Sequence, residues 1–328
     1  MSTAQERTLA QYHSLMQVNA SAHLLRTARE LGLIDELRHG QRTAEQLTES
    51  LSWSPHSASL LLDALLAIGV VEKYDDDFAL SRAGHLLCQY DDDLGDATWG
   101  RLVDVVRGND RRADHDDGKQ FDYLAATQWA HTGAAMQAAE ILDIGEGGEF
   151  NALQILDLGC GSGVWSCAMA HRDPTSTVTA VDNRAALEAA SATAESIGIS
   201  ERFETIEGNP INAEVPTGKF DLVLVAQRIS CLDGIAGKKL LAHAVEATRP
   251  GGRVVVIDLF RGPAKANLAE CVEALRLDLG TKGGRMRSLQ EAQIDMREAG
   301  LERIQFTYLA ASQVNLGLAV GAKPTAST

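Results

Sequence analysis

A run of three glycines follows an apolar segment near the middle of the chain. The residues Asp157-Leu-Gly159-Cys-Gly161-Ser-Gly163 come directly after that segment, and a second apolar segment, residues 177–181, ends at Asp182. Glycines at the end of a strand let a ligand approach the backbone, and they expose the N-terminal amides of the next helix. A carboxylate at the end of the neighbouring strand can accept hydrogen bonds from both hydroxyls of a ribose. The pattern predicts a site for a nucleoside cofactor.

The spacing of these glycines differs from two common nucleotide-binding motifs. The dinucleotide motif G-x-G-x-x-G would place its third glycine at position 164, where this chain has Val164. A phosphate-binding P-loop needs a following Gly-Lys-Ser/Thr, which this segment lacks. The motif of this chain is G-x-G-x-G preceded by an acidic residue. The order of elements around it, which is strand, glycine turn, helix, strand and aspartate, indicates a nucleoside cofactor site more specifically than the glycines alone do.

The second half of the chain alternates apolar strands with helical segments. Near-continuous apolar strands of this kind indicate a mainly parallel sheet covered by helices on both faces, an α/β doubly wound, Rossmann-like architecture. We expect the last two strands to form a terminal hairpin. The predicted strands cover residues 154–159, 177–182, 202–206, 220–225, 253–258, 304–309 and 314–322, and two of the predicted helices cover 184–197 and 238–248.

The first half reads as short helices followed by a small hairpin. A helical stripe ends before Gly32, a capping box opens at Thr43, and Ser54-Pro55 starts a further helix. Residues 70–80 then read as a strand, a turn of three aspartates and a second strand. Three helices followed by such a hairpin predict a winged helix.

Charge and composition exclude several classes of protein. Residues 1–100 hold seven arginines and lysines against fifteen aspartates and glutamates, and the whole chain has a net charge of −15. A wing that follows phosphates would carry Lys or Arg, so we expect no nucleic-acid partner. No apolar run is long enough to span a membrane, and we expect no signal peptide at the N-terminus. The five scattered cysteines predict neither disulfides nor a metal site. We expect a cytoplasmic protein without a membrane partner.

The motifs together resemble a known family. ILDLGCGSG, VTAVDN and RPGGRVVVID are similar to the cofactor strands of class I S-adenosylmethionine-dependent methyltransferases. ARELGLIDEL, RTAEQLTESL and LLDALLAIGVVEK resemble the N-terminal domain of the two-domain small-molecule O-methyltransferases, typified by enzymes that methylate caffeate and hydroxyindoles. The resemblance covers nearly the whole chain. It implies S-adenosyl-L-methionine as cofactor, a small acceptor such as an aromatic molecule, and a homodimer formed through the N-terminal domain.

The resemblance also implies domain limits and residue roles. A winged-helix dimerisation domain would cover residues 1–95, a helical connector 96–150, and the cofactor-binding methyltransferase domain 151–328. The glycines of the turn would flank the methionine part of the cofactor, with an aspartate beneath them. A second aspartate would hold the ribose hydroxyls, and an asparagine would lie near the adenine. These positions are Gly159, Gly161, Gly163, Asp157, Asp182 and Asn209.

One departure from the family pattern concerns the catalytic base. The family has a histidine after the fourth strand as general base on the acceptor hydroxyl, whereas this chain has Ser230, followed by Cys231. A neutral serine is not a competent base at pH 7. His131 and Asp233 are weak candidates for a substitute, so the catalytic residue stays open. Arg228, two positions earlier, could contact the cofactor carboxylate or face solvent.

Three interpretations of this departure remain. The acceptor needs no base, another residue supplies one, or the chain is a cofactor-binding homologue that does not methylate, such as a hydroxylase-like or decarboxylase-like enzyme or a regulatory subunit. A general base typically adds about 10² to 10⁴-fold, and a phenol with a pKa near 10 needs that help. Trp99, Phe121, Tyr123 and Trp129 could line an aromatic acceptor pocket or simply pack in the core.

Overall fold

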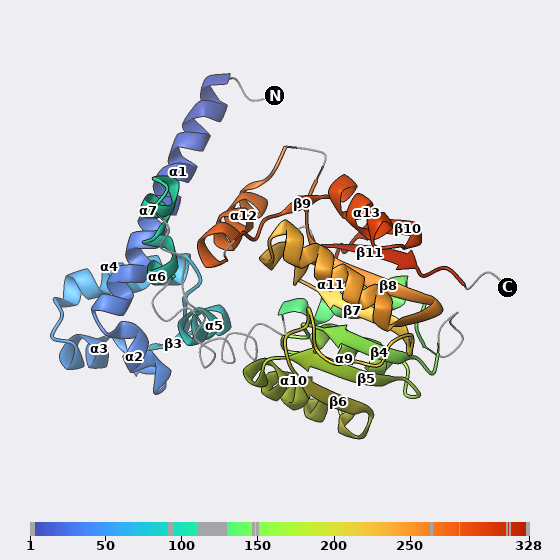
Figure 1. Cartoon of the computed structure of the whole chain (residues 1–328). Helices are drawn as coiled ribbons and strands as arrows, with labels where there is room; N and C mark the ends of the chain where they lie inside the picture. The colour runs from blue at the N-terminus through green and yellow to red at the C-terminus, as the bar shows by residue number, and fades with distance from the viewer. Residues whose placement is uncertain are drawn as a thin grey trace. The chain divides into compact units, whose positions relative to one another are not determined.

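The computed structural model describes residues 4–90, 95–109, 130–145, 148, 151–262, 265–281, 283–312, 314 and 316–325. The chain divides into two compact units, Met1–Ala97 and Thr98–Thr328 (Figure 1). Phe121, Tyr123 and Trp129, which the sequence suggested as pocket residues, lie outside the described residues. Among the helices that are described, none is long and apolar enough to cross a membrane.

The first unit consists of helices around a small antiparallel sheet with strand order β1-β3-β2. Leu47, Leu62 and Leu65 are completely buried at its centre. Its elements are α1 (Ala4–Glu30), α2 (Leu33–Arg38), β1 (Arg42–Thr43), α3 (Ala44–Ser50), α4 (Pro55–Ala67), β2 (Val71–Tyr74), β3 (Asp77–Leu80) and α5 (Arg82–Tyr90), followed by α6 (Asp96–Trp99) at the boundary between the two units.

Local sequence explains where these elements begin and end. Gly32 adopts a left-handed conformation with φ 77°, which separates α1 from α2. The predicted capping box is present, because the Thr43 hydroxyl accepts from the amide of Gln46 and the Gln46 side chain accepts from the amide of Thr43. Ser54 is the N-cap of α4 but makes no side-chain capping bond. The predicted hairpin turns at Asp75, which has φ 53°.

The second unit is built on a mainly parallel sheet with strand order β10-β11-β8-β7-β4-β5-β6 (Figure 1). Strands β4 to β8 run parallel, and the terminal hairpin of β10 and β11 adds antiparallel to β8. The strands are β4 (Gln154–Leu158), β5 (Thr177–Asp182), β6 (Phe203–Glu207), β7 (Phe220–Ala226), β8 (Thr248–Arg261), β9 (Arg287–Ser288), β10 (Glu302–Tyr308) and β11 (Leu316–Ala322).

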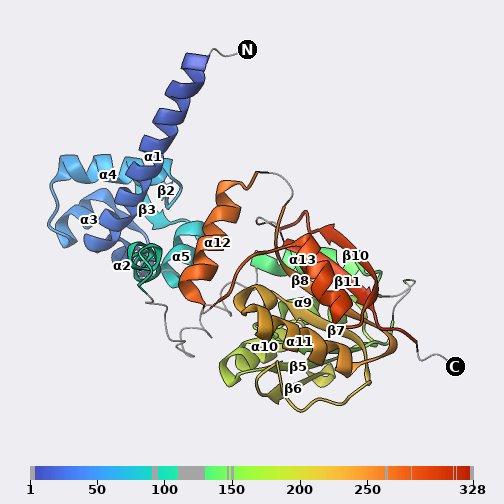
Figure 2. The same ribbon diagram turned by 45° about the horizontal axis from the view of Figure 1, so that its top comes forward.

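Helices cover both faces of this sheet, which confirms the predicted doubly wound α/β architecture. Along β7, Leu222 and Leu224 pack with α9 and the helical residues 130–141, whereas Val223 and Val225 pack with α11 and α13. The alternation follows from the two-residue period of a strand. Figure 2 shows α11 and α13 side by side. The helices described in this unit, not all of which lie on the sheet, are α7 (Leu102–Val106), α9 (Val164–Arg172), α10 (Arg184–Ser196), α11 (Gly234–Ala247), α12 (Leu268–Gly280) and α13 (Leu289–Glu298).

Three details differ from the expected elements. Strand β8 begins at Thr248, whereas we predicted a strand from residue 253. Thr248 pairs with Phe220 of β7, and the Gly251 amide and Gly252 carbonyl pair with Lys323. A Pro-Gly-Gly sequence predicts a turn, and here tertiary pairing extends the strand through it. Strands β1 and β9 were not expected, since a two-residue strand carries no periodicity that a sequence can reveal.

Candidate functional site

The glycine turn connects β4 to α9 at the carboxyl ends of the parallel strands. Gly159, Gly161 and Gly163 have φ values of 79°, 55° and 69°, a left-handed region that residues with a Cβ rarely adopt. A Cβ on Gly163 would also lie 3.0 Å from the Cβ of Ala190 on α10. The strand order reverses here, since β5 lies on one side of β4 and β7 on the other. Ligands of open α/β sheets bind at such a switch point.

Asp182 ends β5 and lies against the turn. Its side chain is buried, one carboxylate oxygen accepts from the Gly161 amide at 3.1 Å, and the other accepts from the Asn183 amide at 2.8 Å. Each carboxylate oxygen has a second lone pair, so the group can still accept from hydroxyls. The structure therefore brings together the glycine turn and the aspartate that the sequence singled out.

Asn209 follows β6 and is tied to the same place. The Gly208 amide donates to the Asp182 carbonyl at 3.0 Å. The Asn209 side-chain oxygen accepts from the Ile211 amide at 3.0 Å, which makes a turn directly after the strand. Asn209 thus lies at the carboxyl ends of the strands, next in the chain to a residue bonded to Asp182.

Asp157 lies within β4, beneath the glycine turn, and is fully buried. The Ser166 hydroxyl donates to its Oδ2 at 2.6 Å, while its Oδ1 has no hydrogen-bond partner. The pKa of Asp157 is raised to about 7, chiefly by burial and in part by the Asp182 charge, against the hydrogen bond from Ser166, which lowers it. The group therefore titrates close to neutral pH.

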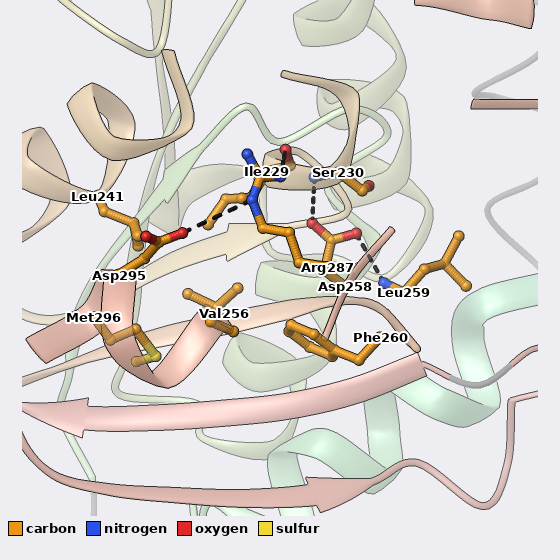
Figure 3. Close-up of a pocket in the computed structure, with 11 residues that line it drawn as sticks. Ile229, Ser230, Leu241, Val256, Asp258, Leu259, Phe260, Arg287, Asp295 and Met296 are labelled. Carbon is orange, nitrogen blue, oxygen red and sulfur yellow. Dashed lines mark hydrogen bonds and ion pairs between the residues drawn. The ribbon is translucent and has the colours of Figure 1, made fainter. Parts of the chain in front are cut away.

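The loop after β7 carries the residue at the expected base position. Gln227 has φ 51°, and a 3-10 turn, η2, follows over Ile229–Cys231. Ser230 is 4% exposed, and its amide donates to Asp258 Oδ2 at 2.8 Å (Figure 3). Asp258 is buried as well, and that burial raises its pKa. Ser230 and Asp258 line a mostly apolar hollow with Val256, Phe260 and Met296.

This hollow is separate from the glycine turn. Its lining residues come from η2, α11, β8, β9 and α13, and the residues predicted to bind the cofactor are absent from it. The hollow under the loop after β7 is therefore lined by a different set of residues from those that we expect to bind the cofactor.

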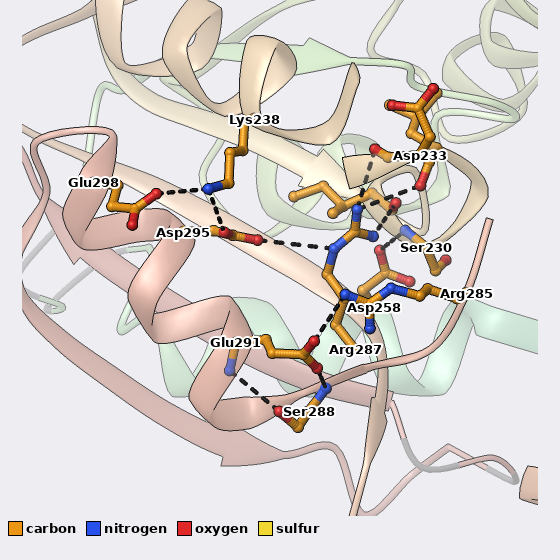
Figure 4. A network of polar contacts seen from close by, with 12 residues as sticks. Ser230, Asp233, Lys238, Asp258, Arg285, Arg287, Ser288, Glu291, Asp295 and Glu298 are labelled. Carbon is orange, nitrogen blue, oxygen red and sulfur yellow. Dashed lines mark hydrogen bonds and ion pairs between the residues drawn. The ribbon is translucent and has the colours of Figure 1, made fainter. Parts of the chain in front are cut away.

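Arg287, which sequence reasoning missed, fixes the shape of this loop. Its buried guanidinium donates to the carbonyls of Ile229, Leu232 and Asp233 (Figure 4). Asp295 forms an ion pair with it at 3.8 Å. No local signal identifies this residue, because its partners lie more than fifty positions earlier in the chain.

The two weak base candidates have different surroundings. Asp233 is the N-cap of α11, and one of its oxygens accepts from the amides of Ile235 and Ala236, both at 2.8 Å. The His131 ring lies 5.9 Å from the Trp165 ring, at an angle of 31°. Burial lowers the pKa of His131, and the nearby Glu273 charge raises it by less. His131 is therefore a neutral imidazole at pH 7, able to accept a proton.

Trp165 connects His131 to the loop after β7. Its indole nitrogen donates to the side-chain oxygen of Gln227 at 3.3 Å. Gln227 is three positions before Ser230 in the chain. The described residues thus bring a histidine near this loop from another element, the helical residues 130–141.

Comparison with known proteins gives matches to methyltransferases. Residues 155–252 match a family model described as a methyltransferase domain. A release factor glutamine methyltransferase from Gloeobacter violaceus is 31% identical over 180 residues, which is 47% of this chain and only 58% of the relative. A 3-hydroxy-5-methyl-1-naphthoate 3-O-methyltransferase from Streptomyces sahachiroi is 23% identical over 91% of both chains. Aclacinomycin 10-hydroxylase from Streptomyces purpurascens is 28% identical over 84% of this chain and 80% of its own.

Solved structures share the fold along the whole chain. An O-methyltransferase family protein from Burkholderia thailandensis superposes with a TM-score of 0.74, at 18% identity and full coverage of both chains. Human N-acetylserotonin methyltransferase, in complex with S-adenosylmethionine, gives a TM-score of 0.72 at 19% identity, with 99% of each chain covered.

Proposed function

We propose that this chain, whose residues 155–252 match a family model described as a methyltransferase domain, transfers a methyl group from S-adenosylmethionine to an oxygen atom of a small organic acceptor. The observation that carries the proposal is the left-handed glycine turn with Asp182 hydrogen-bonded to it at the switch point of the sheet. The relative that matches along 91% of both chains is named for O-methylation of a hydroxynaphthoate. That name supports a hydroxylated aromatic acid as the acceptor class.

The residues at the turn fit the proposed cofactor. We infer that Asp182 accepts hydrogen bonds from the ribose hydroxyls, that Asn209 lies on the adenine side, and that the three glycines flank the methionine portion. Two buried polar atoms, Asp157 Oδ1 and Arg228 Nε, have no hydrogen-bond partner among the residues that the structure describes, as expected at a site that a charged ligand completes. The bound cofactor supplies an electrophilic methyl group on a sulfonium.

We further propose His131 as the general base. Ser230 is a buried neutral hydroxyl, and the Asp233 carboxylate is engaged as a helix cap. His131 is neutral at pH 7 and lies beside Trp165, which is bonded to the loop after β7. His131 would accept the hydroxyl proton of the acceptor at a ring nitrogen, while the bound cofactor would supply the methyl group that the acceptor oxygen takes up.

The test compares His131→Gln with wild type on a panel of hydroxynaphthoates. We expect kcat to fall about 10² to 10⁴-fold for weakly acidic phenols and less for acidic ones, because ionised phenols need no base. The wild-type kcat should decline as pH drops through the lowered pKa of His131, since an imidazolium cannot accept a proton. The variant should lack this limb, and its affinity for S-adenosylmethionine in calorimetry should be unchanged.

His171→Gln is the matched control, because His171 is exposed in the last turn of α9. An unchanged kcat and pH profile in His131→Gln would remove His131 as the base and leave the methylation proposal standing. Wild-type protein that binds S-adenosylmethionine but methylates no acceptor of the panel would contradict O-methylation.

A second candidate is a cofactor-binding homologue that does not methylate. It is favoured by Ser230 at the expected histidine position and by the match to a protein named as a hydroxylase. The same assay separates the two, because only methylation yields S-adenosylhomocysteine together with an acceptor that has gained a methyl group.

We also infer a homodimer formed through α1. Of its 27 residues only Ala28 is buried, while Leu9, Tyr12, Leu15 and Met16 are more than half exposed. An isolated helix with an exposed apolar stripe is marginal in water, so a second copy of the chain is the proposed cover.

A further inference from the structure

The side chain of Arg228 lies directly on the first glycine of the turn. A Cβ built on Gly159 would be 2.9 Å from Cγ of Arg228, 3.0 Å from Cδ and 3.1 Å from Nε. Contacts under 3.0 Å are closer than real Cβ atoms make, so a side chain at position 159 would displace the arginine. Gly159 is thus required both for its φ of 79° and for the space that Arg228 occupies.

The backbone after β7 directs Arg228 to this position. The Gln227 amide donates to the Ile257 carbonyl at 2.6 Å, and the Gln227 side chain accepts from Trp165. The next turn is closed by the Cys231 amide, which donates to the Arg228 carbonyl at 3.2 Å. The backbone on both sides of Arg228 is therefore held by hydrogen bonds, and this directs the arginine side chain toward Gly159.

The guanidinium of Arg228 has an unused donor. Its Nε is buried without a hydrogen-bond partner, and no ion pair of Arg228 is found within the described part of the chain. No hydrogen bond joins Arg228 to Asp157 or Asp182, the two carboxylates of the motif, which accept from Ser166 and from two amides respectively. An unsatisfied buried donor is rare in native proteins, and an absent ligand explains it.

We propose that Arg228 binds the α-carboxylate of the methionine portion of S-adenosylmethionine and of S-adenosylhomocysteine. The inference rests on the proposed cofactor site. That carboxylate is the only anionic group of the cofactor, and the planar guanidinium fork matches a carboxylate with two parallel hydrogen bonds. The loop that carries Ser230 at the expected base position thus contributes to cofactor binding through Arg228.

The test is calorimetric titration of wild type, Arg228→Met and Arg228→Lys with S-adenosylmethionine and with its decarboxylated analogue. Methionine keeps the aliphatic stem against Gly159 and removes the charge. We expect Arg228→Met to bind S-adenosylmethionine about ten- to a hundredfold more weakly, and Arg228→Lys to lose less. For the decarboxylated analogue, wild type and Arg228→Met should have equal affinity.

Arg297→Met, which removes an exposed arginine from α13, is the matched control and should bind both ligands as wild type does. Thermal melting of each variant establishes that it is folded. If Arg228→Met bound both ligands more weakly by the same factor, the arginine would only support the glycine turn, and the proposal would be wrong. Unchanged affinity for both ligands would also overturn the proposal. Because no acceptor is needed, cofactor binding without methyl transfer would contradict the proposed function and leave this assignment intact.

Discussion

Asp157 is a carboxyl group placed where water cannot reach it. It is fully buried, accepts one hydrogen bond from Ser166, and has a pKa raised to about 7, chiefly by burial. The folded chain therefore binds this proton more tightly than the unfolded chain does. Through this group the free energy of unfolding falls as pH rises from the ordinary pKa near 4 to about 7, and stays low above it.

Asp157→Asn removes this dependence while keeping an acceptor for Ser166. We expect the melting temperature of Asp157→Asn minus that of wild type to increase as pH is raised from 5 to 8, because only wild type must then bury a charge. The measurement is thermal unfolding of both proteins, without cofactor, at several pH values in that range. A difference that does not change with pH would contradict the raised pKa.

Asp173→Asn is the matched control. Asp173 is buried too, but hydrogen bonds from Ser176, Thr175 and Ala152 outweigh burial and lower its pKa. It is thus charged in both the folded and the unfolded chain across pH 5 to 8. Its contribution is lost only at lower pH, so the difference between this variant and wild type should stay constant over the same range.

The positions of side chains that follow from nearby sequence could be predicted, and positions that depend on distant contacts could not. The glycine turn and Asp182 were predictable, because strand ends in a parallel sheet meet at one edge. The contact of Arg228 with Gly159 and the triple carbonyl contact of Arg287 depend on segments brought together only by folding. The single unpartnered oxygen of Asp157 is likewise visible only in three dimensions.

At the scale of elements, residues of β9 and α13 stabilise the loop after β7. Arg287 donates to three carbonyls of this loop and its side chain is 4% exposed, whereas Arg285, two residues earlier, is 54% exposed and pairs with Glu291 at 2.7 Å (Figure 4). Both are arginines beside α13, but only one is removed from water. They form a matched pair for measuring what the buried contacts contribute.

Arg287→Met should lower the free energy of unfolding by about 3 to 5 kcal/mol, because it leaves buried carbonyls without their donor and removes one of the two ion-pair partners of Asp295, the other being Lys238 at 3.7 Å. Arg285→Met should cost about 0 to 1 kcal/mol, as exposed ion pairs do. Urea unfolding of the three proteins gives both values. Equal, small losses in the two variants would show that the loop does not depend on Arg287.

The elements themselves were largely predictable. Strand β5 has the expected bounds, and the Thr43 capping box forms as expected, because both follow from local patterns. Strand β8 extends beyond the prediction because Thr248 pairs with Phe220 of β7 and because Lys323 pairs with Gly251 and Gly252. Sequence periodicity describes one element at a time, so strand extension by a remote partner lies beyond it.

At the scale of the whole molecule, the proposed homodimer depends on one stripe of α1. At about 100° per residue, Leu9, Tyr12, Leu15 and Met16 lie within about a third of the helix circumference, with Tyr12 near the middle, while Ser14 lies on the other side.

Wild type at micromolar concentration should show about twice the 35.2 kDa mass of one chain in light scattering. Tyr12→Glu should give a single-chain mass, because a charge buried in an apolar interface has no partner there. Ser14→Glu adds the same charge off the stripe and should remain dimeric. A wild-type protein with the mass of one chain, or dissociation by both substitutions alike, would contradict an interface on this stripe.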